Sequence, residues 1–167
     1  MPRFDRITEH HPVDSFRCGN ADLDDWLADA ALNSDRSGTA RVYVWLDEIG
    51  EMIGYFAIAP HTVRREGLPR SVARGSPDVI PGFLLARLAV AESSQGKGIG
   101  GRLVVEALRT TLEAIRIGGG RVIVVDAIDD HAHSFYEHFG FRPISETGGR
   151  LVMKASTAAA SVGVSWP

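Results

Sequence analysis

A glycine-rich segment in the middle of the chain combines residue types that bind phosphate groups. It reads Gln95-Gly96-Lys97-Gly98-Ile99-Gly100-Gly101-Arg102 and opens a stretch with helical spacing of apolar residues, 99–115. Glycine lets the backbone approach a ligand closely, and the free amides and dipole at a helix start favour an anion. The segment therefore predicts a pyrophosphate site.

The residues before this segment support the same interpretation. Phe83–Val90 is a largely apolar run and predicts a strand. Strand, glycine turn and helix in this order form a phosphate-binding layout. The alternative is a glycine-rich turn that merely joins strand to helix. A Walker-type loop is excluded, because Lys97 is followed by glycine instead of serine or threonine.

The rest of the chain predicts further strands and helices around this unit. The expected elements are a helix over Asn20–Leu32 capped by Asn20, a hairpin of Arg41–Leu46 and Met52–Ile58, a long basic loop over Pro60–Pro81, strands over Arg121–Asp126 and Leu151–Lys154, and a helix from Asp129 to a stop at Gly140. Residues 155–167 are small and polar, so we expect a poorly ordered tail. Residues 1–154 then form one α/β (α+β) domain.

Composition narrows the class of protein. The chain has 167 residues, a hydrophobic fraction of 44%, a charged fraction of 23% and a net charge of -3, as expected for one folded domain without a generally basic coat. Cys18 is the lone cysteine, which excludes an internal disulfide. No apolar run is long enough to span a bilayer and the start lacks a secretion signal, so we expect a cytoplasmic protein.

Three segments, in the expected order along the chain, make it resemble the GNAT superfamily of N-acetyltransferases. Gln95, Gly98 and Gly100 match the family's pyrophosphate loop, Gln/Arg-x-x-Gly-x-Gly/Ala. The strand Leu85–Val90 precedes it, and Ala132–Phe141 is similar to the family's Ala-x-x-Phe-Tyr-x-x-x-Gly-Phe segment.

The resemblance implies a mixed central sheet with splayed parallel strands and a site for acetyl-CoA. The pantetheine arm would lie between Leu85–Val90 and Val122–Asp126. The implied cofactor contacts are Leu88, Ala89, Val90, Gln95, Gly96, Lys97, Gly98, Ile99, Gly100, Gly101, Arg102 and Tyr136.

Tyr136 looks like the tyrosine that protonates the departing thiolate in many of these enzymes. The alternative is a core aromatic packed with Phe135 and Phe139. Asp129 departs from the family pattern, which often has asparagine at this position, and it can serve as a helix cap.

No convincing general base emerges from the two central strands. Arg87, Glu92 and Asp126 are the polar residues on or next to them. A lysine amine with a pKa of about 10.4 needs help to lose its proton, whereas an α-amine near ~7.7–8.0 is already partly neutral. The expected acceptor is therefore an α-amine.

A second resemblance is specific to one branch of the superfamily. Phe16–Leu27 is similar to the opening of GNAT-type toxins of toxin–antitoxin modules, Phe-x-Cys-Gly followed by Leu-Asp-x-Trp/Phe-Leu. The resemblance implies acetylation of the α-amine of aminoacyl-tRNA, arrest of translation and neutralisation by an antitoxin, often of the ribbon-helix-helix type. A homodimer is compatible with the sequence.

A tRNA substrate requires cations that contact phosphates. The best candidates are Arg64, Arg65, Arg70, Arg74 and Arg87. The six histidines show no ligand spacing, and we expect no metal site. Two alternatives remain open: an acetyltransferase for a small amine or a protein amino terminus, and a non-catalytic acyl-CoA-binding regulator.

Overall fold

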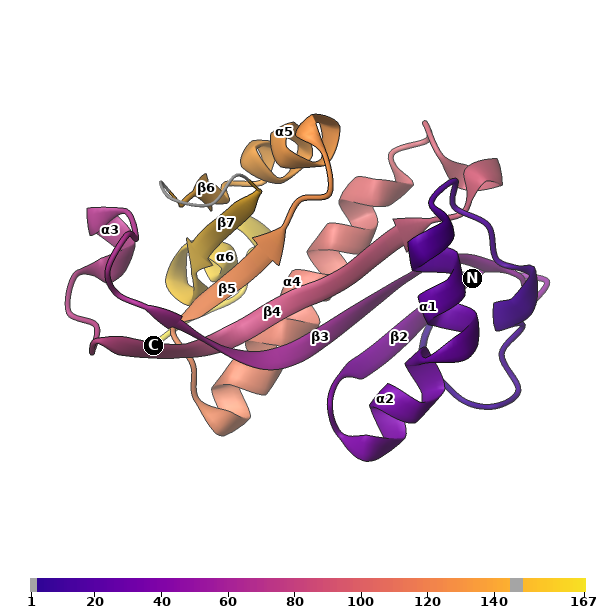
Figure 1. Ribbon diagram of the computed structural model, residues 1–167, viewed down its shortest axis with the longest axis horizontal. Coiled ribbons are helices and arrows are strands. Elements are labelled where there is room, and N and C mark those ends of the chain that lie inside the picture. The colour runs from indigo at the N-terminus through magenta and orange to yellow at the C-terminus, as the bar shows by residue number, and fades with distance from the viewer. Residues whose placement is uncertain (1–2, 145–148) are drawn as a thin grey trace. The chain divides into compact units, whose positions relative to one another are not determined.

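A mixed sheet is the framework of the protein in the computed structural model, which describes residues 3–144 and 149–167 (Figure 1). Its described strands run in the order β1-β2-β3-β4-β5-β7-β6. The strands are β1 (Arg3–Arg6), β2 (Arg41–Leu46), β3 (Met52–Arg64), β4 (Val79–Val90), β5 (Val122–Asp126), β6 (Arg142–Pro143) and β7 (Arg150–Lys154). The helices are α1 (Ala21–Asp29), α2 (Ala31–Ser37), α3 (Arg70–Ala73), α4 (Ile99–Gly118), α5 (Asp130–His138) and α6 (Ala155–Val162).

The chain divides into two compact units. The first comprises residues 1–59 and 86–107, and the second comprises residues 60–85 and 108–167. Strands β3 and β4 and helix α4 run from one unit into the other. No helix in the described part of the chain is long and apolar enough to cross a membrane.

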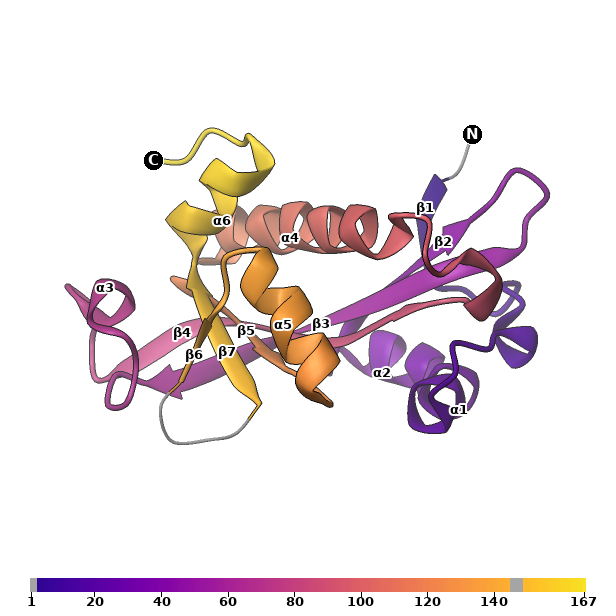
Figure 2. The same ribbon diagram turned by 90° about the horizontal axis from the view of Figure 1, so that it is seen from above.

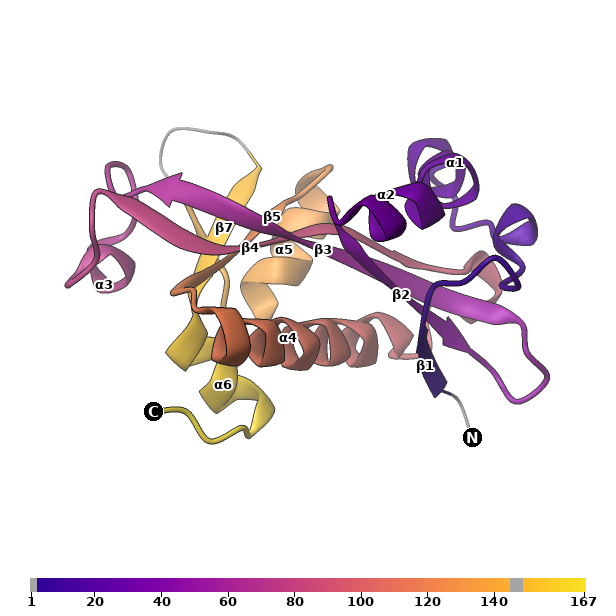
Figure 3. The same cartoon turned by 90° about the horizontal axis from the view of Figure 1, so that it is seen from below.

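In the first unit, the hairpin of β2 and β3 is sandwiched between helices. The two strands pair antiparallel as the sequence predicts. Helices α1 and α2 cover one face, and the start of α4 covers the other (Figures 2 and 3). Side chains alternate accordingly: a Cβ on Gly54 would meet Leu103 of α4 at 3.3 Å, whereas Tyr55 contacts the ring of Trp26 in α1.

The predicted helix over Asn20–Leu32 is two helices. Asn20 caps α1, because its side chain accepts a hydrogen bond from the Leu23 amide. Ala30 then leaves helical geometry, with φ -125° and ψ -25°, and α2 begins at Ala31. Leu27 and Ala31, on either side of the break, both belong to the buried core of this unit.

In the second unit, β4 and β5 form the parallel pair. The pairing runs from Gly82 and Val122 to Leu85 and Val125, while β4 itself continues to Val90. Gly82 is required by crowding, since a Cβ there would lie 2.2 Å from the Val122 carbonyl oxygen. β7 pairs antiparallel with the other edge of β5.

Two predictions at the ends of this unit are wrong. The expected loop over Pro60–Pro81 is shorter, because β3 continues through Arg64 and β4 already begins at Val79. The helix α3 forms within the remaining loop. The expected poorly ordered tail begins with a helix, α6. Alanine favours helix, and Ala155, Ala158, Ala159 and Val162 are buried.

Burial of α6 gives a test of its role. We expect Ala158→Asp to lower the free energy of unfolding by at least about 2 kcal/mol, because Ala158 is 0% exposed and the new carboxylate would be buried without a partner. Ala160→Asp, at an exposed position of the same helix, should cost less than about 1 kcal/mol. Urea denaturation measures both, and equal losses would contradict the packing of α6.

Candidate active site

The start of α4 presents its backbone to a ligand. The first amides of a helix have no acceptor within the helix, and the dipole adds positive potential there. Gly96 and Gly98 lead into it with φ of +76° and +75°, and a Cβ on either would meet nothing within 4 Å. The backbone conformation, not crowding, therefore requires glycine here, and the turn stays open to an anion such as a pyrophosphate.

Gln95 fixes the conformation of this turn. Its side-chain Nε2 donates hydrogen bonds to the carbonyl oxygens of Cys18, at 2.8 Å, and Val90, at 2.9 Å. Lys97 donates from Nζ to the Ser93 carbonyl oxygen at 3.0 Å. The glutamine of the motif thus shapes the loop, and its amide nitrogen is already engaged by the protein.

The other predicted cofactor residues, apart from Tyr136, lie in the same unit. Leu88, Ala89 and Val90 end β4, with Ala89 in the core and its neighbours half-buried. Ile99, Gly100 and Gly101 form the first turn of α4. The Arg102 guanidinium lies 5.1 Å from the centre of the Trp45 ring.

Sequence reasoning missed the structural role of the segment before α1. The Glu92 amide donates to the Arg17 carbonyl oxygen at 2.9 Å, next to the bond from Gln95 to Cys18. The Cys18 amide donates to the buried Asp24 carboxylate at 2.9 Å. The Phe-x-Cys-Gly motif therefore supports the glycine turn, although Cys18 and Gln95 are 77 residues apart in the sequence. The signal in the sequence for this structural role was the position of the Phe-x-Cys-Gly motif just before Leu-Asp-x-Trp-Leu.

Tyr136 lies in the second unit, on α5. Its ring is 7% exposed and packs edge-on against Phe135 and Phe141, at centroid distances of 5.4 and 5.7 Å. Every fully enclosed side-chain nitrogen or oxygen of the described residues has a hydrogen-bond partner, and the Tyr136 hydroxyl makes no hydrogen bond with another described residue. The hydroxyl oxygen is therefore not fully enclosed, although the residue is buried.

Burial raises the pKa of Tyr136 well above the ordinary value of a phenol. The hydroxyl therefore stays protonated throughout the neutral range and can always donate a hydrogen bond. The ring of Tyr136 packs in the core and its hydroxyl remains able to donate. The interpretations of Tyr136 as a core aromatic and as the residue that assists the departing thiolate are therefore compatible.

Asp126, one of the polar residues considered as a base, is held by an arginine. Arg150 donates to both carboxylate oxygens, at 2.7 and 2.8 Å, and its Nη1 lies 3.1 Å from His61 Nε2. The Arg150 hydrogen bonds lower the pKa of Asp126. Burial and the Arg150 charge lower the pKa of His61, which accepts from Arg150 as a neutral ring.

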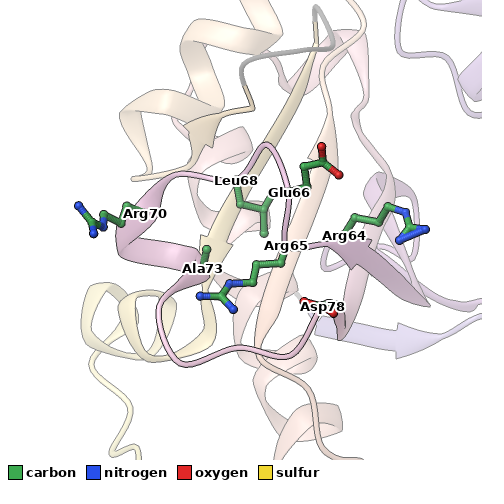
Figure 4. A pocket seen from close by; sticks show the side chains of 7 residues that line it. All are labelled: Arg64, Arg65, Glu66, Leu68, Arg70, Ala73 and Asp78. Atoms are coloured by element: carbon green, nitrogen blue, oxygen red, sulfur yellow. The ribbon is translucent and has the colours of Figure 1, made fainter.

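The arginines of the 64–74 segment are only partly gathered. A hollow of about 560 Å³ is lined by Arg64, Arg65, Glu66, Leu68, Arg70, Ala73 and Asp78. Figure 4 shows Arg65 lying across it, while Arg64 and Arg70 point away on opposite sides. Arg74 is exposed and outside this lining, and Arg87 belongs to the other unit. Among the described residues, no group of three or more His, Cys, Asp or Glu side chains could hold a metal ion.

Comparison with known proteins identifies the class that this fold and loop define. Residues 38–143 match the acetyltransferase (GNAT) domain model, and the chain belongs to this family. It is 36% identical over 155 residues to the tRNA-acetylating toxin of Mycobacterium tuberculosis, covering 92% of this chain and 93% of that protein.

Two solved structures share the fold. AtaT complexed with acetyl-methionyl-tRNAfMet has a TM-score of 0.86 at 25% identity, covering 96% of this chain and 98% of that one. A mutant AtaT bound to acetyl-CoA and the C-terminus of the antitoxin AtaR has a TM-score of 0.80 at 23% identity, covering 95% and 96%.

The packing of Cys18 predicts an unreactive thiol. Burial, and then the hydrogen bond with Asp24, raise its pKa to about 11. A raised pKa favours the neutral thiol, so thiolate is scarce at pH 8 and appears only as the pH approaches that value. We expect iodoacetamide to alkylate Cys18 at pH 8 at least about tenfold more slowly than a free cysteine, whose pKa is about 8.5.

Asp24→Asn supplies the comparison, because it removes the carboxylate that raises the pKa of Cys18 and should therefore speed alkylation. Peptide mass spectrometry follows both proteins. Wild-type alkylation at the rate of a free cysteine would refute the arrangement around Cys18.

Proposed function

We propose that the chain is an acetyl-CoA-dependent N-acetyltransferase toxin that acetylates the α-amino group of aminoacyl-tRNA and so blocks translation. The observation that carries the proposal is its 36% identity, over nearly its whole length, to a tRNA-acetylating toxin. The open glycine turn before α4 and the hydroxyl of Tyr136 suit the chemistry that this reaction requires, and both support the proposal.

The turn from Gln95 to Arg102 is our candidate for holding acetyl-CoA. Its open glycines and the first amides of α4 suit a pyrophosphate, and the end of β4, Leu88–Val90, would flank the pantetheine arm. When bound, acetyl-CoA supplies a thioester carbon that an amine attacks. We infer no metal cofactor for this chemistry.

Tyr136 is our candidate for the group that assists the departing sulfur. Its protonated hydroxyl can donate a hydrogen bond to negative charge that develops there. Its raised pKa lies above that of a thiol, so complete proton transfer is uphill. The hydrogen bond to the departing sulfur is therefore the main contribution of this residue.

The groups near the strands favour an acceptor that needs little help from a base. Asp126 is bound by Arg150, and Arg87 is a cation. Glu92 is exposed in the turn after β4. An α-amine with a pKa near ~7.7–8.0 is partly neutral in water, so it can attack without a strong base.

The proposed partners follow from the same assignment. Arg64, Arg65, Arg70 and Arg74, at the end of β3 and in the segment after it, are candidates for contact with tRNA phosphates. Arg64 and Arg70 point in opposite directions, which suits a broad surface (Figure 4). AtaT is bound to the antitoxin AtaR in a structure with this fold, and we propose a cognate antitoxin of the ribbon-helix-helix type here. A substrate used in translation implies action in the cytoplasm.

Cell-free translation tests this function. Addition of the wild-type protein with acetyl-CoA should arrest synthesis, and omission of acetyl-CoA should abolish the effect. Tyr136→Phe should slow the onset of arrest by at least about a hundredfold, because one donor to developing charge is worth roughly 10²–10³ in rate.

The ring of Tyr136 is retained in the phenylalanine variant, so folding and acetyl-CoA affinity should match the wild type. Calorimetric titration with acetyl-CoA provides that control. Arrest by the wild type without acetyl-CoA, or equal arrest by both proteins, would refute the assignment.

A further inference from the structure

Arg87 lies on the face of β4 that is opposite to α4. Its guanidinium is 5.0 Å from the centre of the Trp26 ring, and Trp26 belongs to α1. Helices α1 and α4 cover opposite faces of the strands in this unit (Figure 2). Arg87 therefore projects away from the helix start where we place the cofactor pyrophosphate.

Trp26 is held rigidly enough to fix the position of a cation. Its ring stacks on Tyr55 at a centroid distance of 6.2 Å and an interplanar angle of 12°. Tyr55 is 0% exposed, and its hydroxyl donates to the Leu23 carbonyl oxygen at 2.7 Å. The three groups form a layered stack from the core to the Arg87 guanidinium.

The charge of Arg87 is not neutralised inside the described part of the protein. The residue is half-buried, and its Nη1 donates to the Ala86 carbonyl oxygen at 2.8 Å. No ion pair joins it to a carboxylate of a described residue, whereas Arg116, which also lies over a tryptophan, pairs with Glu113. A ring face contributes only about 0.5–2 kcal/mol to holding a cation, and the remaining guanidinium N–H groups suit a phosphate.

We propose that Arg87, positioned by Trp26, binds a phosphodiester group at the 3′ end of the acceptor tRNA. This inference rests on the proposed function. Arg87 directly precedes Leu88–Val90, which would flank the pantetheine arm, so an acceptor phosphate at Arg87 belongs to the nucleotides next to the aminoacyl ester. Because Arg87 and the start of α4 are on opposite faces of the strand, the phosphate belongs to the acceptor and not to acetyl-CoA.

Two acceptors that differ in phosphate content test the proposal. Arg87→Gln should lower kcat/KM for charged tRNA by about ten- to a hundredfold, the equivalent of losing a charge-assisted contact of roughly 1.5–3 kcal/mol. With aminoacyl-adenosine, which has no phosphate, the loss should be at least about fivefold smaller. Arg116→Gln is the matched control, and it should leave both reactions as in the wild type.

The variants of Trp26 separate positioning from simple charge. Trp26→Phe keeps a ring beneath Arg87, so it should retain most of the ratio of kcat/KM for charged tRNA to kcat/KM for aminoacyl-adenosine. Trp26→Leu removes the ring and should lower this ratio. Calorimetric affinity for acetyl-CoA should not change in Arg87→Gln. An equal loss with both acceptors, or a weakened affinity for acetyl-CoA, would overturn the proposal.

Binding of the trinucleotide CCA gives a readout that does not depend on transfer. Tryptophan fluorescence should report binding to the wild type, and Arg87→Gln should weaken it at least about tenfold. If CCA binds through Arg87 but charged tRNA is never acetylated, the phosphate site stands and the proposed function fails. If Arg87→Gln leaves CCA binding unchanged, the phosphate site is refuted.

Discussion

The first turn of α4 can serve as an anion site only if the glycine turn before it is held in one conformation. Glycine alone works against this, because it loses the most conformational freedom on folding. The Gln95 side chain supplies the constraint with hydrogen bonds to Cys18 and Val90. One amide group thus joins the end of β4, the glycine turn and the segment that precedes α1, and the site depends on these contacts.

The segment that precedes α1 also links the two proposed substrate sites. The Cys18 amide is held by the Asp24 carboxylate. Asp24 lies in the same helix as Trp26, and the Arg87 guanidinium lies over the Trp26 ring. The first unit therefore has features suited to anions on both faces of β4, backbone amides on the α4 side and a guanidinium on the α1 side. This division fits a reaction in which two phosphate-bearing substrates meet at one strand.

Local patterns in the sequence predicted much of the fold. The hairpin, the β4–α4 unit and the caps at Asn20 and Asp129 are confirmed, since each depends on residues close together in the chain. The break at Ala30 was missed because the apolar spacing continues across it, and the order of α6 was missed because burial of Ala158 depends on tertiary packing. The glycine loop was visible as a motif, but the Arg150–Asp126 pair and the Trp26–Arg87 stack join distant residues that no local spacing reveals.

The central claim is that the acceptor is the amino group of a charged tRNA. The most direct measurement incubates the protein with labelled acetyl-CoA and bulk aminoacylated tRNA, with uncharged tRNA, peptides and polyamines as parallel acceptors. The account predicts label only on charged tRNA, released together with the amino acid when the ester is hydrolysed. Label confined to peptides or polyamines would contradict the claim, although the protein would still be an acetyltransferase.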